Sequence, residues 1–175
     1  AGRGDLPLRP ENYLVVQARI AKERKNLDRL LNQMSRHGIY PEVHAESMGG
    51  FRLCDNEALR IIGSMLHDFY TFVENIAKTV AARVDGGIPD GDDWPRELLE
   101  QMSLPIPGLR PPLLSGDTVE LLNKFRAFRH VFRNIYGFQL DAGRTLELLR
   151  DLNRTVVALN TDLDRFLSEI DRAVL

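Results

Sequence analysis

The residues with the clearest chemical potential lie in one short segment, residues 124–136. This segment contains four cationic side chains, one histidine and no carboxylate. Arginine offers a planar set of N–H donors that matches phosphate oxygens, and histidine exchanges protons near neutral pH. Clustered cations repel one another, so they favour an anionic ligand or acidic neighbours. The segment therefore combines side chains that can bind phosphate or acidic groups with a titratable imidazole.

The same segment is amphipathic when it is placed on a helix, where each residue turns about 100°. The apolar face comprises Phe125, Phe128, Val131, Phe132 and Ile135. The cationic face follows the i, i+3, i+4, i+7 spacing and comprises Arg126, Arg129, His130 and Arg133. Tyr136 lies at the border, near Arg129. Two interpretations stay open: the cationic face binds an anion, or it pairs with Asp and Glu of a neighbouring helix.

The residue order from Arg129 to Tyr136 resembles the signature of the HEPN superfamily, specifically the HepT-like toxin ribonucleases. That signature is an arginine, a polar residue, three further residues and a histidine, with a tyrosine two positions later. Arg129, His130 and Tyr136 match the arginine, the polar residue and the tyrosine, and Asn134 stands where the histidine is expected. The similarity extends over about residues 53–149. Its other elements are Phe69-Tyr70, Glu74-Asn75-Ile76, Asp85-Gly86-Gly87 and Trp94.

The resemblance implies a homodimer in which two copies of the motif line a basic cleft that cleaves RNA without a metal. In this chemistry the RNA 2′-hydroxyl attacks the adjacent phosphate, and Arg129 holds that phosphate and stabilises the developing charge. A histidine moves the protons. Lys124, Arg126 and Arg133 are expected to bind the RNA backbone. The partners of the family are nucleotidyltransferase antitoxins of the MNT type, which modify the motif tyrosine, here Tyr136.

Asn134 leaves alternatives open for this chemistry. An amide orients a phosphate or a water molecule, but it does not exchange a proton near pH 7. His130 is the candidate replacement, although it lies about 40° around the helix and one turn away from position 134. The candidate catalytic residues are therefore Arg129, His130 and Asn134. The chain is either a ribonuclease or a catalytically degraded HEPN module that binds RNA or its antitoxin; a purely structural helical bundle is the third alternative.

Helical periodicity through most of the chain supplies the elements that must position these residues. Helices are expected over residues 12–37, 55–85, 94–102, 115–136 and 141–173, with Asp55 as the N-cap of the second. Four prolines make residues 103–116 an extended connector, expected to lie across the bundle. We therefore predict an all-α, up-and-down bundle of four to five helices. It is expected to form a single HEPN-like domain over residues 1–175, with 1–11 as a flexible leader.

The last helix carries a heptad pattern, which is typical of a packing seam. Its positions are Leu149, Leu152, Val156, Leu159, Leu163, Phe166, Ile170 and Ala173. The seam packs either inside one bundle or between two chains as a coiled coil, and both interpretations stay open. Elsewhere, His67 is expected at the edge of the core or in a groove, and Trp94 is expected to anchor the core.

Composition narrows the remaining classes of function. With Cys54 as the single cysteine, no intrachain disulfide can form, and no apolar run approaches the ~18–20 residues that span a bilayer. We expect a cytoplasmic protein. Histidine and cysteine lack metal-binding spacing, so we expect neither a metal nor another cofactor. Asp90, Asp92 and Asp93 are expected to cap the following helix rather than to bind a cation.

Overall fold

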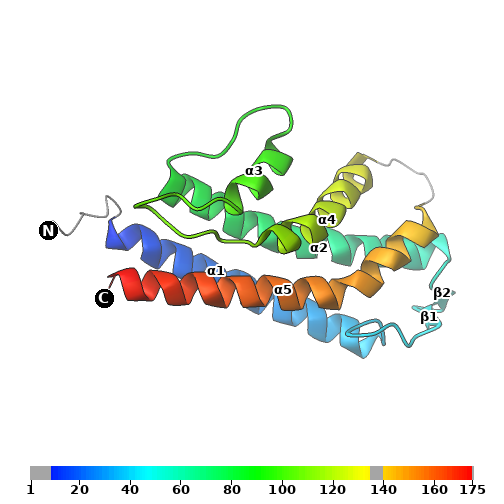
Figure 1. The fold of residues 1–175 in the computed structure, drawn as a ribbon. Helices are drawn as coiled ribbons and strands as arrows, with labels where there is room; N and C mark the ends of the chain where they lie inside the picture. The colour runs from blue at the N-terminus through cyan, green and yellow to red at the C-terminus, as the bar shows by residue number, and fades with distance from the viewer. Residues whose placement is uncertain (1–8, 135–139, 175) are drawn as a thin grey trace, which may run out of the picture.

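The computed structural model describes residues 9–134 and 140–174, and these form an all-α fold, as predicted (Figure 1). The helices are α1 (Pro10–Arg36), α2 (Asn56–Val80), α3 (Trp94–Met102), α4 (Gly116–Asn134) and α5 (Ala142–Val174). A π-helical turn, η1 (Ala81–Asp85), continues α2. Two short strands, β1 (Ser47–Met48) and β2 (Phe51–Arg52), form an antiparallel hairpin between α1 and α2.

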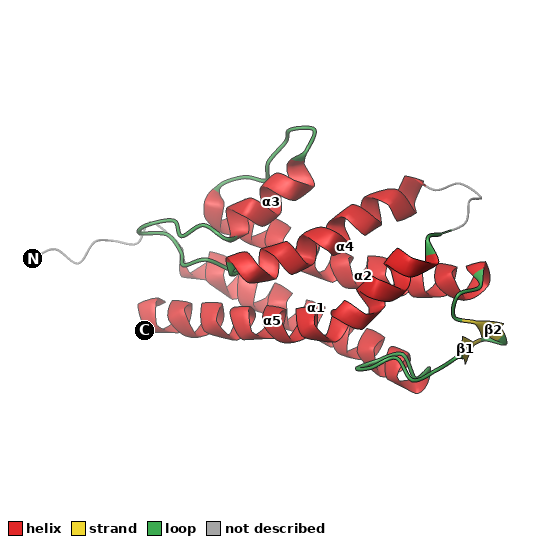
Figure 2. Ribbon diagram, turned by 45° about the vertical axis from the view of Figure 1, so that its right-hand side comes forward, coloured by secondary structure: helices red, strands yellow, loops and turns green. Residues whose placement is uncertain are grey.

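Helix α2 is the centre of the bundle, because it packs against each of the other four helices. Helices α3 and α4 lie on one side of α2, and α1 and α5 lie side by side on the other (Figures 1 and 2). The start of α1 and the end of α5 meet at the same end of the bundle, where Gln17 Nε2 donates a hydrogen bond to Asp171 Oδ1 at 2.8 Å. Helix α3 also packs against α4.

The heptad pattern of α5 packs inside this chain. Its first seven positions, from Leu149 to Ile170, are buried in the hydrophobic cluster that all five helices share. The eighth, Ala173, is exposed, so the seam ends one position earlier than predicted. Burial of the seam within the chain favours the bundle interpretation over a coiled coil between chains.

The ends of several elements differ from the prediction. Helix α1 begins at Pro10 rather than after it, because proline lacks an N–H and fits the first helical turn. Asp55 occupies the N-cap position of α2, as predicted, but its carboxylate accepts a hydrogen bond from the Arg52 backbone N–H at 3.0 Å and makes no capping hydrogen bond. The segment between the first two predicted helices, for which no regular structure was predicted, contains the β1–β2 hairpin. Of the leader expected at 1–11, residues 1–8 lie outside the described residues.

Helix α4 follows the predicted amphipathic pattern except at one position. Phe125 and Phe128 are buried and Phe132 is half-buried, but Val131 is 45% exposed and so does not belong to the core face. Ile135 lies outside the described residues. Ser115 caps the start of α4, because its Oγ accepts a hydrogen bond from the Thr118 N–H. Among the described helices, none is long and apolar enough to cross a membrane.

A glycine lets α4 approach α2 closely. Gly63 of α2 is buried, and a Cβ atom there would lie 2.8 Å from Phe132 Cε2 and 3.3 Å from Leu140 Cδ1. Those distances are shorter than van der Waals contact, so a larger residue would push the end of α4 away from α2. Gly63 therefore sets the spacing between the helix that carries the cationic face and the helix behind it.

Gly63→Ala is expected to destabilise the fold. Overpacking costs about 1–3 kcal/mol, whereas the higher helix propensity of alanine contributes only ~1 kcal/mol of stability. The measurement is the free energy of unfolding from urea titrations followed by circular dichroism. Gly116→Ala is the matched control, because a Cβ atom at Gly116 meets open space. Equal stabilisation by both substitutions would contradict the close approach.

Candidate functional site

A cavity of about 590 Å³ lies between α2, α3 and α4. Its α4 wall is formed by Arg126, Arg129, His130, Arg133 and Asn134, which the cationic-face pattern and the motif had selected. Helix α2 contributes Tyr70 and Glu74, and the start of α3 contributes Asp92, Asp93, Trp94 and Pro95. The fold therefore gathers most of the predicted site residues around one cavity.

Arg129 is the most constrained side chain of this wall. Its Nη1 lies 2.7 Å from Glu74 Oε2, its Nε donates to His67 Nε2 at 3.4 Å, and its guanidinium lies over the ring of Tyr70. These contacts leave the side chain only 13% exposed, although it still lines the cavity. Neither polar contact uses the two N–H groups on Nη2. Arg129 is thus held in one orientation. It pairs with an acid of a neighbouring helix, and its Nη2 donors can also bind an anion, so both interpretations of the cationic face apply to it.

Glu74 connects the two walls of the cavity. Its side chain is 5% exposed and contacts two cations, Arg129 through Oε2 and Lys78 through Oε1 at 3.2 Å. Lys78 Nζ in turn lies 4.5 Å from the centre of the Trp94 ring. A buried carboxylate needs such partners, because an unpaired charge away from water is costly. The chain of contacts therefore links α4, through α2, to the start of α3.

Tyr70 is almost completely buried behind Arg129. Burial raises the pKa of its phenol well above the ordinary value, and the negative charge of Glu74 raises it further, against the opposing effect of Arg126 and Arg129. The phenol therefore stays protonated at neutral pH. It contributes an aromatic surface and a neutral hydroxyl, and no additional charge, to the cavity lining.

The other α4 residues of the cavity are more open. Arg126 is half-buried, and its Nε donates to Asn123 Oδ1 at 3.0 Å. His130 and Arg133 are exposed. Asn134 Nδ2 donates to the backbone oxygen of His130 at 2.8 Å, so this amide satisfies a carbonyl in the last turn of α4.

Two predicted site residues do not join the cavity as described. Lys124 points to another surface, where its Nζ lies 3.7 Å from Asp151 Oδ2 of α5. It lines a separate hollow there with Asp117, Glu120, Leu121 and Arg154. Tyr136 lies outside the described residues, so its relation to the cavity stays a prediction.

Carboxylates balance the cations of the cavity lining. Three arginines face three acidic residues, Glu74, Asp92 and Asp93. The segment 124–136 contains no acid, but the fold brings acids to it from α2 and from the start of α3. Within one chain the lining of the cavity is therefore a mixed surface of cations and carboxylates.

The aspartates before α3 differ from the capping prediction. Asp93 occupies the N-cap position, and its backbone oxygen accepts from the N–H groups of Arg96 and Glu97. Its carboxylate, however, makes no capping hydrogen bond and pairs with the guanidinium of Arg96. Asp92 is exposed and lines the cavity. Trp94 is half-buried rather than fully buried, so it borders both the core and the cavity.

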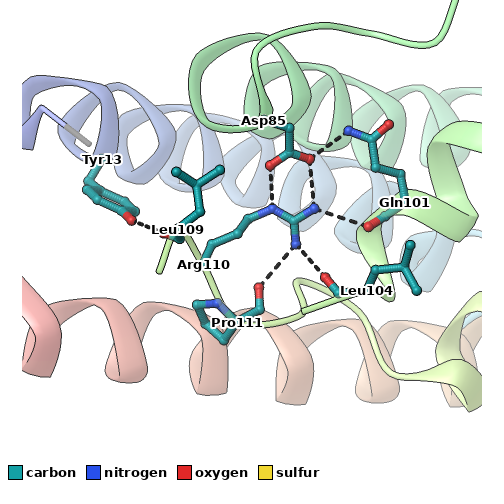
Figure 3. Close-up of polar contacts among 7 residues, drawn as sticks. All are labelled: Tyr13, Asp85, Gln101, Leu104, Leu109, Arg110 and Pro111. Carbon is teal, nitrogen blue, oxygen red and sulfur yellow. Dashed lines mark hydrogen bonds and ion pairs between the residues drawn. The ribbon is translucent and has the colours of Figure 1, made fainter. Parts of the chain in front are cut away.

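A buried ion pair fixes α3 against the rest of the bundle (Figure 3). Arg110 of the connector donates from Nε to Asp85 Oδ1 at 2.6 Å and from Nη2 to Asp85 Oδ2 at 2.7 Å. Its remaining donors reach the backbone oxygens of Gln101, Leu104 and Pro111. One side chain thus joins the end of η1, the end of α3 and the connector.

Two further contacts complete this anchor. Gln101 Nε2 donates to Asp85 Oδ2 at 2.7 Å, and the Tyr13 hydroxyl donates to the backbone oxygen of Leu109 (Figure 3). Leu113 and Leu114 are buried, and their N–H groups bond to the Met102 backbone oxygen. The connector therefore lies across the bundle, as predicted, and holds the α3 side of the cavity in place.

Comparison with known proteins provides a family match. A family model with the description HepT-like protein matches residues 61–170, which is more than half of the chain. The matched region contains most of α2, all of α3 and α4, and most of α5. Neither the curated proteins nor the solved structures provide a match.

Proposed function

This chain belongs to the HepT-like protein family, and we propose that it is a cytoplasmic toxin ribonuclease that cleaves RNA at the α2–α3–α4 cavity. The observation that carries the proposal is the α4 wall, which brings Arg126, Arg129, His130 and Arg133 together around one space. Arginine guanidinium groups match the geometry of phosphate oxygens, and an exposed histidine is suited to proton transfer.

Arg129 is the proposed binding group for the phosphate at the cleaved bond. Glu74 and His67 hold its Nη1 and Nε, so the donors on Nη2 are oriented before the substrate arrives. Donors oriented in advance stabilise charge that develops in the transition state without reorganising. Arg126 and Arg133 bind neighbouring phosphates of the RNA backbone.

Cleavage proceeds by attack of the RNA 2′-oxygen on the adjacent phosphorus. A bond forms between that oxygen and phosphorus, and the bond from phosphorus to the 5′-oxygen breaks. His130 takes the proton of the 2′-hydroxyl, and the leaving 5′-oxygen takes a proton from water. The products carry a 2′,3′-cyclic phosphate and a 5′-hydroxyl, and no step uses a metal.

The proposal includes the assembly that the resemblance implies, a homodimer regulated by a nucleotidyltransferase antitoxin that modifies Tyr136.

The second candidate function is a HEPN module that binds RNA or its antitoxin without cleaving. Asn134 favours it, because this amide binds the His130 carbonyl and has no proton to exchange at the place where the motif has a histidine. The two candidates share the phosphate-binding wall and differ only in the proton carrier.

A cleavage assay separates the candidates. Purified wild type, His130→Gln and Asn134→His are incubated with labelled RNA in excess EDTA. If His130 is the proton carrier, wild type cleaves and His130→Gln is slower by about 10²–10⁴-fold, the usual contribution of such a group. Cleavage by Asn134→His alone establishes the binding module. Failure of every variant to bind RNA rejects the ribonuclease and leaves only a module that binds the antitoxin.

Arg133→Ala is expected to weaken RNA binding and to lower the slope of log affinity against log salt by about 1, because one phosphate contact is lost. Fluorescence anisotropy with labelled single-stranded RNA at several salt concentrations measures both quantities. Lys124→Ala removes the same charge from the surface next to Asp151 and serves as the control. Equal effects of the two substitutions would show that binding does not depend on the cavity.

A further inference from the structure

The α3 side of the cavity is chemically unlike the arginine wall. It presents the half-buried indole of Trp94 and the exposed carboxylate of Asp92. Neither group suits a phosphate: the first is apolar and the second repels anions. A ligand that fills the whole cavity must therefore be anionic at one end, and at the other it must be flat and rich in hydrogen-bond donors.

We propose that the α3 side is a base-recognition subsite, in which Trp94 stacks on a guanine base and Asp92 accepts hydrogen bonds from its edge. This inference rests on the proposed RNA binding. It assigns a binding site to the base, whereas the arginines bind the phosphate. A nucleotide carries both required ends on one molecule, with its phosphate for Arg129 and its base for Trp94.

The cavity is large enough for a nucleotide. Its volume of about 590 Å³ is in the middle of the ~300–1,000 Å³ range of small-molecule sites. The charges also fit, because three arginines and three carboxylates balance within the lining. Glu74 pairs with Arg129 and Lys78, and Asp93 pairs with Arg96, which leaves Asp92 to accept hydrogen bonds from the ligand.

Trp94 is positioned to stack on a base. Lys78 Nζ lies over one face of the indole, 4.5 Å from its centre, and Trp94 is one of the residues that line the cavity. The Asp85–Arg110 pair and its hydrogen bonds fix the end of α3, the short helix that begins at Trp94. Stacking of an RNA base on an aromatic side chain is a common mode of recognition and tolerates any base.

Asp92 supplies the selectivity. Asp93 already pairs with Arg96, whereas Asp92 is exposed at the cavity. A carboxylate accepts two hydrogen bonds side by side. The guanine edge offers two adjacent donors, N1–H and N2–H, whereas adenine and cytosine place an acceptor beside their amino group. Asp92 therefore favours guanine over the other two.

The test uses Trp94 as its own reporter, because it is the single tryptophan of the chain. Full-length protein is titrated with 2′-O-methyl hexanucleotides of uridine that carry one central guanosine, adenosine or cytidine, which the proposed chemistry cannot cleave. We expect the guanosine oligonucleotide to change the Trp94 fluorescence and to bind about tenfold more tightly than the other two, as one bidentate base contact provides.

Asp92→Asn and Asp90→Asn form a matched pair in the same loop, and of the two positions Asp92 lines the cavity. Asp92→Asn is expected to bring the three affinities within about threefold of one another, because an amide no longer accepts two hydrogen bonds. Asp90→Asn is expected to keep the preference for guanosine. Both positions are exposed, so neither variant is expected to lose its fold.

Two results overturn the inference in distinguishable ways. The subsite is rejected if the oligonucleotides bind without base preference, or if Asp92→Asn behaves like Asp90→Asn. The proposed RNA binding still stands in that case, provided that Arg133→Ala weakens the binding. If no oligonucleotide binds at all, the proposed function fails and the subsite fails with it.

Discussion

Arg110→Ala is expected to lower the free energy of unfolding by about 3–5 kcal/mol, the usual cost of breaking a buried ion pair. The reason is that Asp85 would stay buried without its cation, and three backbone oxygens would lose their donor. The side chains of Arg110 and Asp85 are 0% and 3% exposed, so water cannot replace the lost contacts. Urea unfolding followed by circular dichroism measures the change.

Arg96→Ala is the matched control for Arg110→Ala. Arg96 also pairs with two acids, Asp93 and Glu100, but its side chain is 50% exposed, and such surface pairs contribute about 0–1 kcal/mol. The double variant Asp85→Leu/Arg110→Met removes both charges and is expected to recover most of the stability. A loss at Arg96 as large as the loss at Arg110 would contradict the assigned role of the buried pair.

Glu74→Gln is expected to separate substrate binding from catalysis. The substitution keeps the shape of the side chain but removes the charge that holds Arg129, so the guanidinium becomes mobile and kcat falls by about 10²-fold, as for a misplaced catalytic group. At the same time the cavity becomes one unit more positive, so RNA affinity stays equal or rises. Single-turnover cleavage and anisotropy binding measure the two effects.

Glu57→Gln provides the control, because Glu57 is an exposed acid in the first turn of the same helix. It changes the net charge equally and is expected to leave kcat unchanged. Parallel losses of affinity and kcat in Glu74→Gln would indicate that Glu74 supports the fold of the site and not the orientation of Arg129. If the wild type does not cleave, the same comparison is made in an Asn134→His background.

The helices and the cationic face of α4 were predictable because both depend on local spacing. The i, i+3, i+4, i+7 pattern selects Arg126, Arg129, His130 and Arg133 without knowledge of any neighbour, and all four line the cavity. Lys124 lies outside this pattern, two residues before Arg126, and accordingly faces Asp151 on another surface. Strict use of the spacing would have excluded Lys124 from the predicted RNA-binding residues.

The acidic partners were not predictable from local spacing, because they come from elements far away in the sequence. Glu74 is 55 residues before Arg129, and its spacing to Lys78 indicates only a surface pair on a helix. Asp92 and Asp93 have the pattern of a capping turn, and only the packing of α3 next to α4 places them at the cavity. The balance of charge in the cavity is therefore a property of the fold.

Two features had a sequence signal that was missed. Arg110 stands in an apolar, proline-rich connector, and a charge buried with such a segment requires a partner. Gly49 and Gly50 stand between the two strands of the hairpin with φ values of 61° and 84°, which is the requirement of a two-residue β-turn between antiparallel strands. The glycine pair could have indicated the hairpin.

The most direct measurement of the central claim is the chemical structure of the RNA ends. Wild type and Arg129→Ala are incubated in EDTA with an oligodeoxynucleotide that contains one ribonucleotide, and the products are analysed by mass spectrometry. We predict cleavage only at the ribonucleotide, with a 2′,3′-cyclic phosphate, and a rate about 10²–10³-fold lower in Arg129→Ala, the cost of removing one oriented donor. Cleavage that does not require the 2′-hydroxyl, or that is unchanged in Arg129→Ala, would contradict the account.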